Sequence, residues 1–191
     1  MFLTIYGTNN IGKSTQCKLL IENLQKKGVK ALHIKYPMYE IEPSGPFLYK
    51  TLRGESQNIT EHELQMWFAI NRHQFQEKKR SLENEYDIII AEDYTETAIA
   101  WGSVKGLQTS YIEQINQFID IEDKTILIDG IRSSNSIESG HIHENQNDLI
   151  EKVRNFLLER AMQKDWIVVN RQEKIEDTQE ILLNKVLNLL K

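Results

Sequence analysis

Residues 7–15 read Gly-Thr-Asn-Asn-Ile-Gly-Lys-Ser-Thr, and this stretch decides the expected fold. It satisfies the pattern G-x-x-x-x-G-K-[ST] at every specified position. An apolar run at residues 2–6 precedes it, and residues 16–24 follow with apolar side chains at helical spacing. In such a strand–loop–helix unit, glycines let backbone N–H groups curl around phosphate oxygens at the positive end of the helix. The stretch therefore predicts a loop that binds a nucleoside triphosphate such as ATP.

Two side chains of this loop are expected to act directly on the phosphates. The Lys13 ammonium would reach the outer phosphates, and the Ser14 hydroxyl would hold a Mg²⁺ ion that bridges them. A plain glycine turn between a strand and a helix is the alternative. The residues predicted to bind the nucleotide are Gly7, Asn10, Gly12, Lys13, Ser14 and Thr15.

Strand and helix patterns alternate along the rest of the chain, which predicts a parallel sheet covered by helices on both faces. We expect one domain over residues 1–191, a three-layer α/β/α fold with five strands and a short lid. The lid candidate is the polar stretch 133–147. Further strands are predicted at 31–36, 87–91, 125–128 and 166–169. Helices are predicted at 13–27, near 47–52, at 61–82 behind the capping pattern of Thr60, around 98–104, from 109, at 149–162 and at 178–190.

Polar residues stand where the predicted strands end, and ligands bind beyond the carboxyl ends of strands in such sheets. Glu92 and Asp93 follow the continuous apolar run at 87–91, which is typical of a strand buried on both faces. A carboxylate at this point is suited to hold Mg²⁺ through water beside Ser14, and we favour Glu92 for this role. The alternative is that the two acids only solvate a strand end.

Phe68 and Arg72 are four residues apart on the predicted helix 61–82, so they share one face. A ring and a guanidinium on one face can stack on a base and bond its edge. A core phenylalanine beside a surface arginine would give the same pattern, so the spacing alone leaves both interpretations open.

Composition narrows the class of partner. The net charge of −5 and the lack of a basic stripe argue against a nucleic-acid polymer. No apolar run reaches the ~18 residues of a membrane span, and the first strand begins too near Met1 for a signal peptide, so we expect a cytoplasmic protein. The single cysteine excludes a disulfide framework and predicts a packed Cys17. His141 and His143 are interpreted as polar lid residues rather than metal ligands.

Several segments in order resemble the thymidylate kinases, P-loop nucleoside monophosphate kinases that move the terminal phosphate of ATP onto dTMP. Residues 2–16 resemble the family's amino terminus, and Tyr36-Pro37 resembles its turn after the second strand. Residues 68–72 are similar to the segment whose ring stacks on thymine and whose arginine bonds its edge. Residues 92–94 fall where the family has Asp-Arg-Tyr, and residues 166–170 resemble the strand before the adenine-side loop.

The resemblance implies phosphorylation of dTMP to dTDP, with ATP and Mg²⁺ as cofactors and small-molecule nucleotides as partners. It makes Phe68 and Arg72 base-site residues, and it allows for a homodimer. Asn9 stands where the family usually has an aspartate that contacts the acceptor sugar. The acceptor-site residues that it implies are Asn9, Phe68, Arg72, Tyr94 and Thr97.

The departures from the family concern positive charge. Asp93 replaces the arginine of Asp-Arg-Tyr, and the lid candidate contains no arginine or lysine. An arginine near the transferring phosphate can be worth ~10³-fold in rate, so these losses count against full activity. Arg132 is the nearest replacement, which makes the expected catalytic set Lys13, Glu92 and Arg132. Two alternatives remain, a diverged nucleotide-binding protein with weak transfer and a deoxynucleoside kinase that uses Glu92 as a base. Further candidates for the acceptor phosphate are Lys35 and Arg53.

Overall fold

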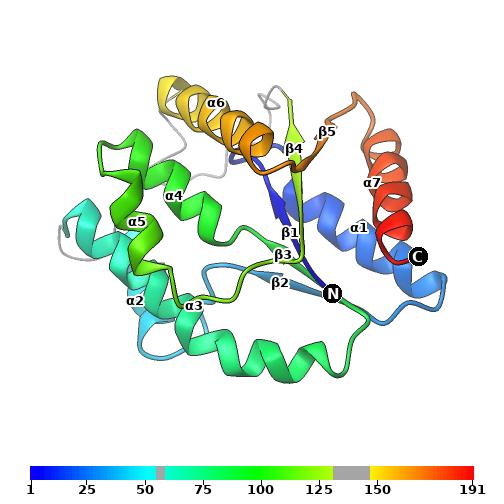
Figure 1. The fold of residues 1–191 in the computed structure, drawn as a ribbon, viewed down its shortest axis with the longest axis horizontal. Helices are drawn as coiled ribbons and strands as arrows, with labels where there is room; N and C mark the ends of the chain where they lie inside the picture. Colours follow the sequence, from blue (N-terminus) through cyan, green and yellow to red (C-terminus); the bar gives the residue numbers. More distant parts are fainter. Residues whose placement is uncertain (55–58, 131–146) are drawn as a thin grey trace.

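Five parallel strands form the centre of the molecule in the computed structural model, which describes residues 1–54, 59–130 and 147–191. The strands stand in the order β2-β3-β1-β4-β5, and all neighbouring pairs are parallel (Figure 1). The predicted five-stranded parallel sheet is therefore confirmed. The strands are β1 (Phe2–Tyr6), β2 (Ala31–Lys35), β3 (Ile88–Glu92), β4 (Lys124–Asp129) and β5 (Ile167–Asn170).

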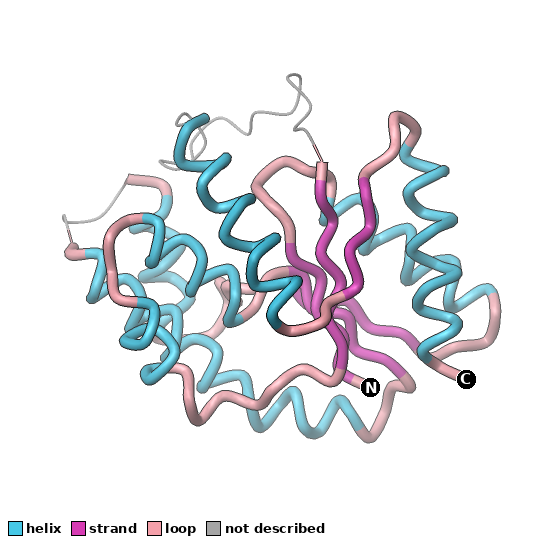
Figure 2. The backbone as a smooth tube through the Cα atoms, turned by 45° about the horizontal axis from the view of Figure 1, so that its top comes forward, coloured by secondary structure: helices cyan, strands magenta, loops and turns pink. Residues whose placement is uncertain are grey.

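Helices cover both faces of the sheet, as Figure 2 shows. One apolar core joins Leu3 of β1 to Leu20 and Leu182, which come from α1 (Lys13–Lys26) and α7 (Ile175–Leu189). The other joins Phe2 to Phe75 and to residues of the helices on the opposite face. Those helices are α3 (Glu61–Glu83), α4 (Thr95–Val104) and α6 (Asn147–Gln163), and the remaining helices are α2 (Ser44–Leu52) and α5 (Thr109–Ile115).

Two of the predicted helix starts show what sets the first turn of a helix. Thr60 caps α3 as predicted, because its Oγ1 accepts a hydrogen bond of 3.2 Å from the backbone N–H of Glu63. Helix α2 begins at Ser44, about three residues before its predicted start. Its first turn is tightly packed, since a Cβ atom at Gly45 would lie 2.3 Å from the carbonyl oxygen of Tyr39. The spacing of apolar residues could not predict that α2 begins at Ser44, because its first turn consists of small residues packed against the backbone of the preceding loop.

The predicted lid falls outside the described residues except at Asn147, where α6 begins. Arg132 and the two lid histidines lie outside them as well.

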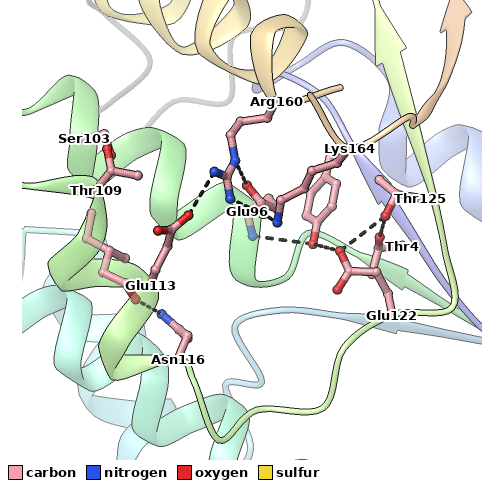
Figure 3. Close-up of polar contacts among 12 residues, drawn as sticks. Thr4, Glu96, Ser103, Thr109, Glu113, Asn116, Glu122, Thr125, Arg160 and Lys164 are labelled. Carbon is pink, nitrogen blue, oxygen red and sulfur yellow. Dashed lines mark hydrogen bonds and ion pairs between the residues drawn. The ribbon is translucent and has the colours of Figure 1, made fainter. Parts of the chain in front are cut away.

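A buried acid joins α6 to α4 (Figure 3). Glu96 of α4 is 2% exposed and accepts two hydrogen bonds from the Arg160 guanidinium, of 2.8 and 2.7 Å. Lys164 donates a third, of 2.6 Å, and Arg160 also pairs with Glu113 of α5 at 2.9 Å. Helix α6 is thus fixed to α4 and α5, and α4 carries Thr97 of the predicted acceptor site.

We expect Glu96→Gln to lower the free energy of unfolding by ~1.5–3 kcal/mol, because it removes the buried carboxylate charge that bonds Arg160 and leaves the guanidinium with the more exposed Glu113 as its carboxylate partner. Lys164 is 46% exposed, so Lys164→Ala should cost only ~0–1 kcal/mol. Urea unfolding followed by circular dichroism measures both values. Equal losses in the two variants would contradict the central role of Glu96.

Candidate active site

A cleft of about 700 Å³ lies at the carboxyl ends of the strands. Its wall runs from the phosphate loop past the ends of β2 and β3 to α3 and α4, and it includes the residues that follow β5. Residues predicted from distant parts of the sequence are therefore brought into one space. Those that line the cleft are Asn9, Asn10, Gly12, Lys13, Ser14, Thr15, Phe68, Arg72, Glu92, Tyr94 and Thr97.

The phosphate loop depends on two glycines for different reasons. A Cβ atom at Gly7 would lie 2.7 Å from the carbonyl oxygen of Ile128, so only glycine lets the loop approach β4 this closely. Gly12 has a φ of 103° and caps the start of α1, where a side chain would strain the backbone. Asn10 has a φ of 63°, and its buried Nδ2 has no hydrogen-bond partner among the described residues. This amide can therefore donate to a bound phosphate oxygen.

The Lys13 ammonium is held inside the loop. Its Nζ donates to the carbonyl oxygens of Gly7 and Thr8 at 2.9 and 3.0 Å, and it lies 3.7 Å from Oδ1 of Asp93. Asp93 adopts a left-handed φ of 60° and accepts a hydrogen bond of 2.8 Å from Thr97 Oγ1. Burial raises the pKa of Asp93 above its usual range, although Lys13 acts in the opposite direction. The Lys13 ammonium is thus fixed within the loop by two carbonyl oxygens and faces the Asp93 carboxylate.

Glu92, the last residue of β3, accepts a hydrogen bond of 2.5 Å from Ser14 Oγ. The Lys35 ammonium lies 3.0 Å from both Ser14 Oγ and Glu92 Oε1, and Nε2 of His33 lies 3.3 Å from Glu92 Oε2. Burial acts to raise the pKa of Glu92, but His33, Lys35 and Ser14 together lower it to about 2. The residue is therefore ionised at neutral pH. A hydroxyl and a carboxylate oxygen side by side fit the oxygen ligands that Mg²⁺ takes.

Phe68 and Arg72 of α3 also line the cleft. The Arg72 Cζ lies 6.0 Å from the centre of the Phe68 ring, as their spacing on α3 predicted. The guanidinium is buried and donates to Asn116 Oδ1 and to the carbonyl oxygen of Tyr94, both at 3.0 Å. Burial lowers the Arg72 pKa, and nearby tyrosines led by Tyr94 oppose this. Arg72 Nε has no hydrogen-bond partner among the described residues, which leaves one donor for a ligand.

Tyr94 forms part of the cleft wall but belongs mainly to the core. It is 1% exposed, and its ring packs edge-on against Phe2 with 5.2 Å between the centroids. Its hydroxyl donates to the carbonyl oxygen of Asp120 at 2.9 Å. Because its ring is packed in the core and its hydroxyl is already bonded, Tyr94 contributes to the site through its backbone carbonyl, which accepts a hydrogen bond from Arg72.

Several cations line the cleft. Lys35 and Arg53 were expected near the acceptor phosphate, and both contribute to the wall. Arg171 and Lys105 line the cleft as well, and neither was predicted from the sequence. Arg171 directly follows β5, so the rule that ligands bind beyond strand ends could have found it. Lys105 pairs with Glu61 at 2.7 Å across two helices, and no local pattern signals that contact.

Comparison with known proteins identifies the family. A family model described as thymidylate kinase matches residues 5–181. The chain belongs to the thymidylate kinase family. A probable thymidylate kinase of Thermococcus gammatolerans is 29% identical to it, and the match covers 93% of this chain and 91% of the relative. The thymidylate kinase of Thermosipho melanesiensis is 26% identical, with 92% of each chain covered.

Solved thymidylate kinases share the fold. The structure from Candida albicans matches with a TM-score of 0.79 and 20% identity, over 98% of this chain and 91% of that one. The structure from Ehrlichia chaffeensis matches with a TM-score of 0.73 and 20% identity, over 100% and 98% of the two chains. The predicted P-loop α/β fold is confirmed.

Membership of the thymidylate kinase family makes the chain a nucleotide-binding phosphotransferase with small-molecule nucleotide substrates. The predicted kinase activity agrees with this, and the two alternatives, a nucleotide-binding protein with weak transfer and a deoxynucleoside kinase, are not favoured. In the described ranges, no helix combines the length and apolar character needed to cross a membrane.

Proposed function

We propose that this member of the thymidylate kinase family transfers the terminal phosphate of ATP to dTMP, forming dTDP. The observation that carries the proposal is a single cleft lined both by a lysine-bearing phosphate loop and by a buried arginine beside an aromatic ring. The loop suits a triphosphate and the arginine with its ring suits a base. The catalytic residues in this proposal are Lys13, Glu92 and Arg132, the last of which lies outside the described residues.

On the donor side, the loop N–H groups and the Asn10 amide would bind the phosphates of ATP. Lys13 would exchange its contacts with the carbonyls of Gly7 and Thr8 for phosphate oxygens. Ser14 Oγ would be a direct ligand of Mg²⁺, and Glu92 would hold the same ion through water. Bound Mg²⁺ neutralises part of the charge that develops on the transferring phosphate. Glu92 also keeps Ser14 oriented through their 2.5 Å hydrogen bond.

On the acceptor side, Phe68 would stack on thymine while Arg72 bonds its edge. Asn9, Tyr94 and Thr97 would surround the sugar. Transfer would be in line, without a covalent intermediate, so positioning and charge do most of the catalytic work. Besides Lys13, the cleft supplies positive charge from Lys35, Arg53 and Arg171.

We expect Phe68→Ala to raise the KM for dTMP about 10-fold or more and to leave the KM for ATP unchanged. Loss of a stacking contact costs ~1–3 kcal/mol, and Phe68 belongs to the proposed acceptor site. Arg72→Gln should act in the same direction. Initial rates measured while each substrate is varied separately give both constants. Equal increases for ATP and dTMP would instead indicate a structural role for this pair.

We also propose that the chain works in the cytoplasm as one catalytic domain over residues 1–191, with 133–147 as its lid. Self-association into a homodimer is part of the same proposal, and sedimentation equilibrium tests it directly. A monomer at all concentrations would remove that part and leave the assignment of the cleft unaffected.

A further inference from the structure

Three potential metal ligands converge beneath the phosphate loop. Cys17 comes from α1, His33 from β2 and Glu92 from the end of β3. A sulfur, an imidazole nitrogen and a carboxylate oxygen from these residues all lie within 4.8 Å of one another. In the sheet register, His33 of β2 is paired with Ile90 of β3, so the two side chains lie on the same face of the sheet. Ile90 belongs to the same core cluster as Cys17 of α1, so His33 is on the face that α1 covers.

The two oxygens of Glu92 have different surroundings. Oε1 is bonded to Ser14 and faces Lys35. Oε2 is buried without a hydrogen-bond partner among the described residues, and so is Nε2 of His33, 3.3 Å away. A buried polar atom without a partner is uncommon in proteins, and coordination of an ion is one way in which such an atom is satisfied. Cys17, a free thiol with no exposed surface, completes the group.

We propose that Cys17, His33 and Glu92 bind one divalent ion of the zinc class. Thiolate, imidazole and carboxylate are the ligand types that Zn²⁺ takes, and three protein ligands leave a fourth position for water. Mg²⁺ and Ca²⁺ prefer oxygen, so the sulfur and nitrogen select against them. His33 is 19% exposed and gives the ion a route from solvent. The ion would use Oε2, which separates this site from the Mg²⁺ position at Ser14.

Binding requires a proton to leave the Cys17 thiol for solvent as the metal–sulfur bond forms. Burial raises the pKa of this thiol well above its usual range. Proton release opposes binding at low pH, so the affinity for zinc should rise as pH increases. The simpler alternative is an ion pair between protonated His33 and Glu92, which gives Cys17 no role.

The test uses cobalt(II) as a spectroscopic probe for zinc, titrated into the reduced full-length protein. A cobalt–thiolate bond adds a charge-transfer band in the near ultraviolet, and Cys17 is the only cysteine in the chain. We expect the band to saturate at one equivalent of cobalt and to disappear when zinc is added. A protein that shows no such band at saturating cobalt would overturn the proposal.

Matched variants assign the ligands. Cys17→Ala should abolish the band, and His33→Gln should weaken zinc binding at least ~10-fold, the lower limit typical even for loss of an outer-shell partner. The control is His73→Gln, at an exposed histidine of α3, which should bind as the native chain does. Zinc should also raise the Tm of the native protein and not that of Cys17→Ala, which separates ligand loss from misfolding. Zinc affinity unchanged in both ligand variants would favour the ion pair and overturn the proposal.

Discussion

Lys13→Ala should reduce phosphate transfer ~10²–10³-fold, the size of effect seen when one preorganised donor is removed from a transition state. Lys13 Nζ is already held in the phosphate loop by the carbonyls of Gly7 and Thr8, so it needs little reorganisation to meet a phosphate. The side chain is also 6% exposed, which shields its charge from water and strengthens its interaction. ADP release in a coupled assay measures the rate, and calorimetry with ATP measures binding.

Lys18 provides the matched control for this variant. It lies on the same helix as Lys13 but is exposed, so Lys18→Ala should retain the native rate and affinity. Comparison of the two variants separates loss of the site from a general loss of positive charge. Native activity in Lys13→Ala would mean that the loop is only a structural turn, and the donor half of the proposed site would have to be abandoned.

The parts of the site that consist of consecutive residues were the ones best predicted from the sequence. The phosphate loop occupies nine neighbouring positions, and its backbone geometry follows from two glycines and the helix start behind them. The pairing of Phe68 and Arg72 could also be predicted, because a spacing of four residues places two side chains on the same face of any helix. The alternation of strands and helices indicated the parallel sheet by the same kind of local rule.

Contacts across the sheet could not be predicted in this way. Lys35 and His33 meet Glu92 because β2 pairs with β3, and neither strand pattern states which strand is its neighbour. The Asn116 partner of Arg72 comes from a position 44 residues away. The Glu96–Arg160 pair spans 64 residues and has no local signature. These contacts fix the orientation and the ionisation of the side chains in the site. Because they join residues that are far apart in the sequence, only the structure could reveal them.

Asp93 shows how a departure from the family is accommodated. Where the family has an arginine, this carboxylate accepts a hydrogen bond from Thr97 and lies near Lys13. Its carboxylate therefore lies close to the ammonium group of the phosphate loop. Lys35 and Arg53 also line the cleft. On this interpretation, these two cations compensate for the lost arginine on the acceptor side.

Glu92→Gln is expected to raise the Mg²⁺ concentration needed for half-maximal activity by ~10–100-fold, as loss of a partner that orients a metal ligand typically does. The amide keeps the shape of the side chain but removes the charge that faces Ser14 Oγ, Lys35 and His33. Transfer from ATP to dTMP measured across a Mg²⁺ series gives this value. Asp93→Asn, which removes a neighbouring carboxylate outside the proposed metal site, should leave the Mg²⁺ requirement unchanged. Equal shifts in the two variants would indicate a general effect of negative charge in the cleft, and Glu92 would then lose its assigned role at the metal.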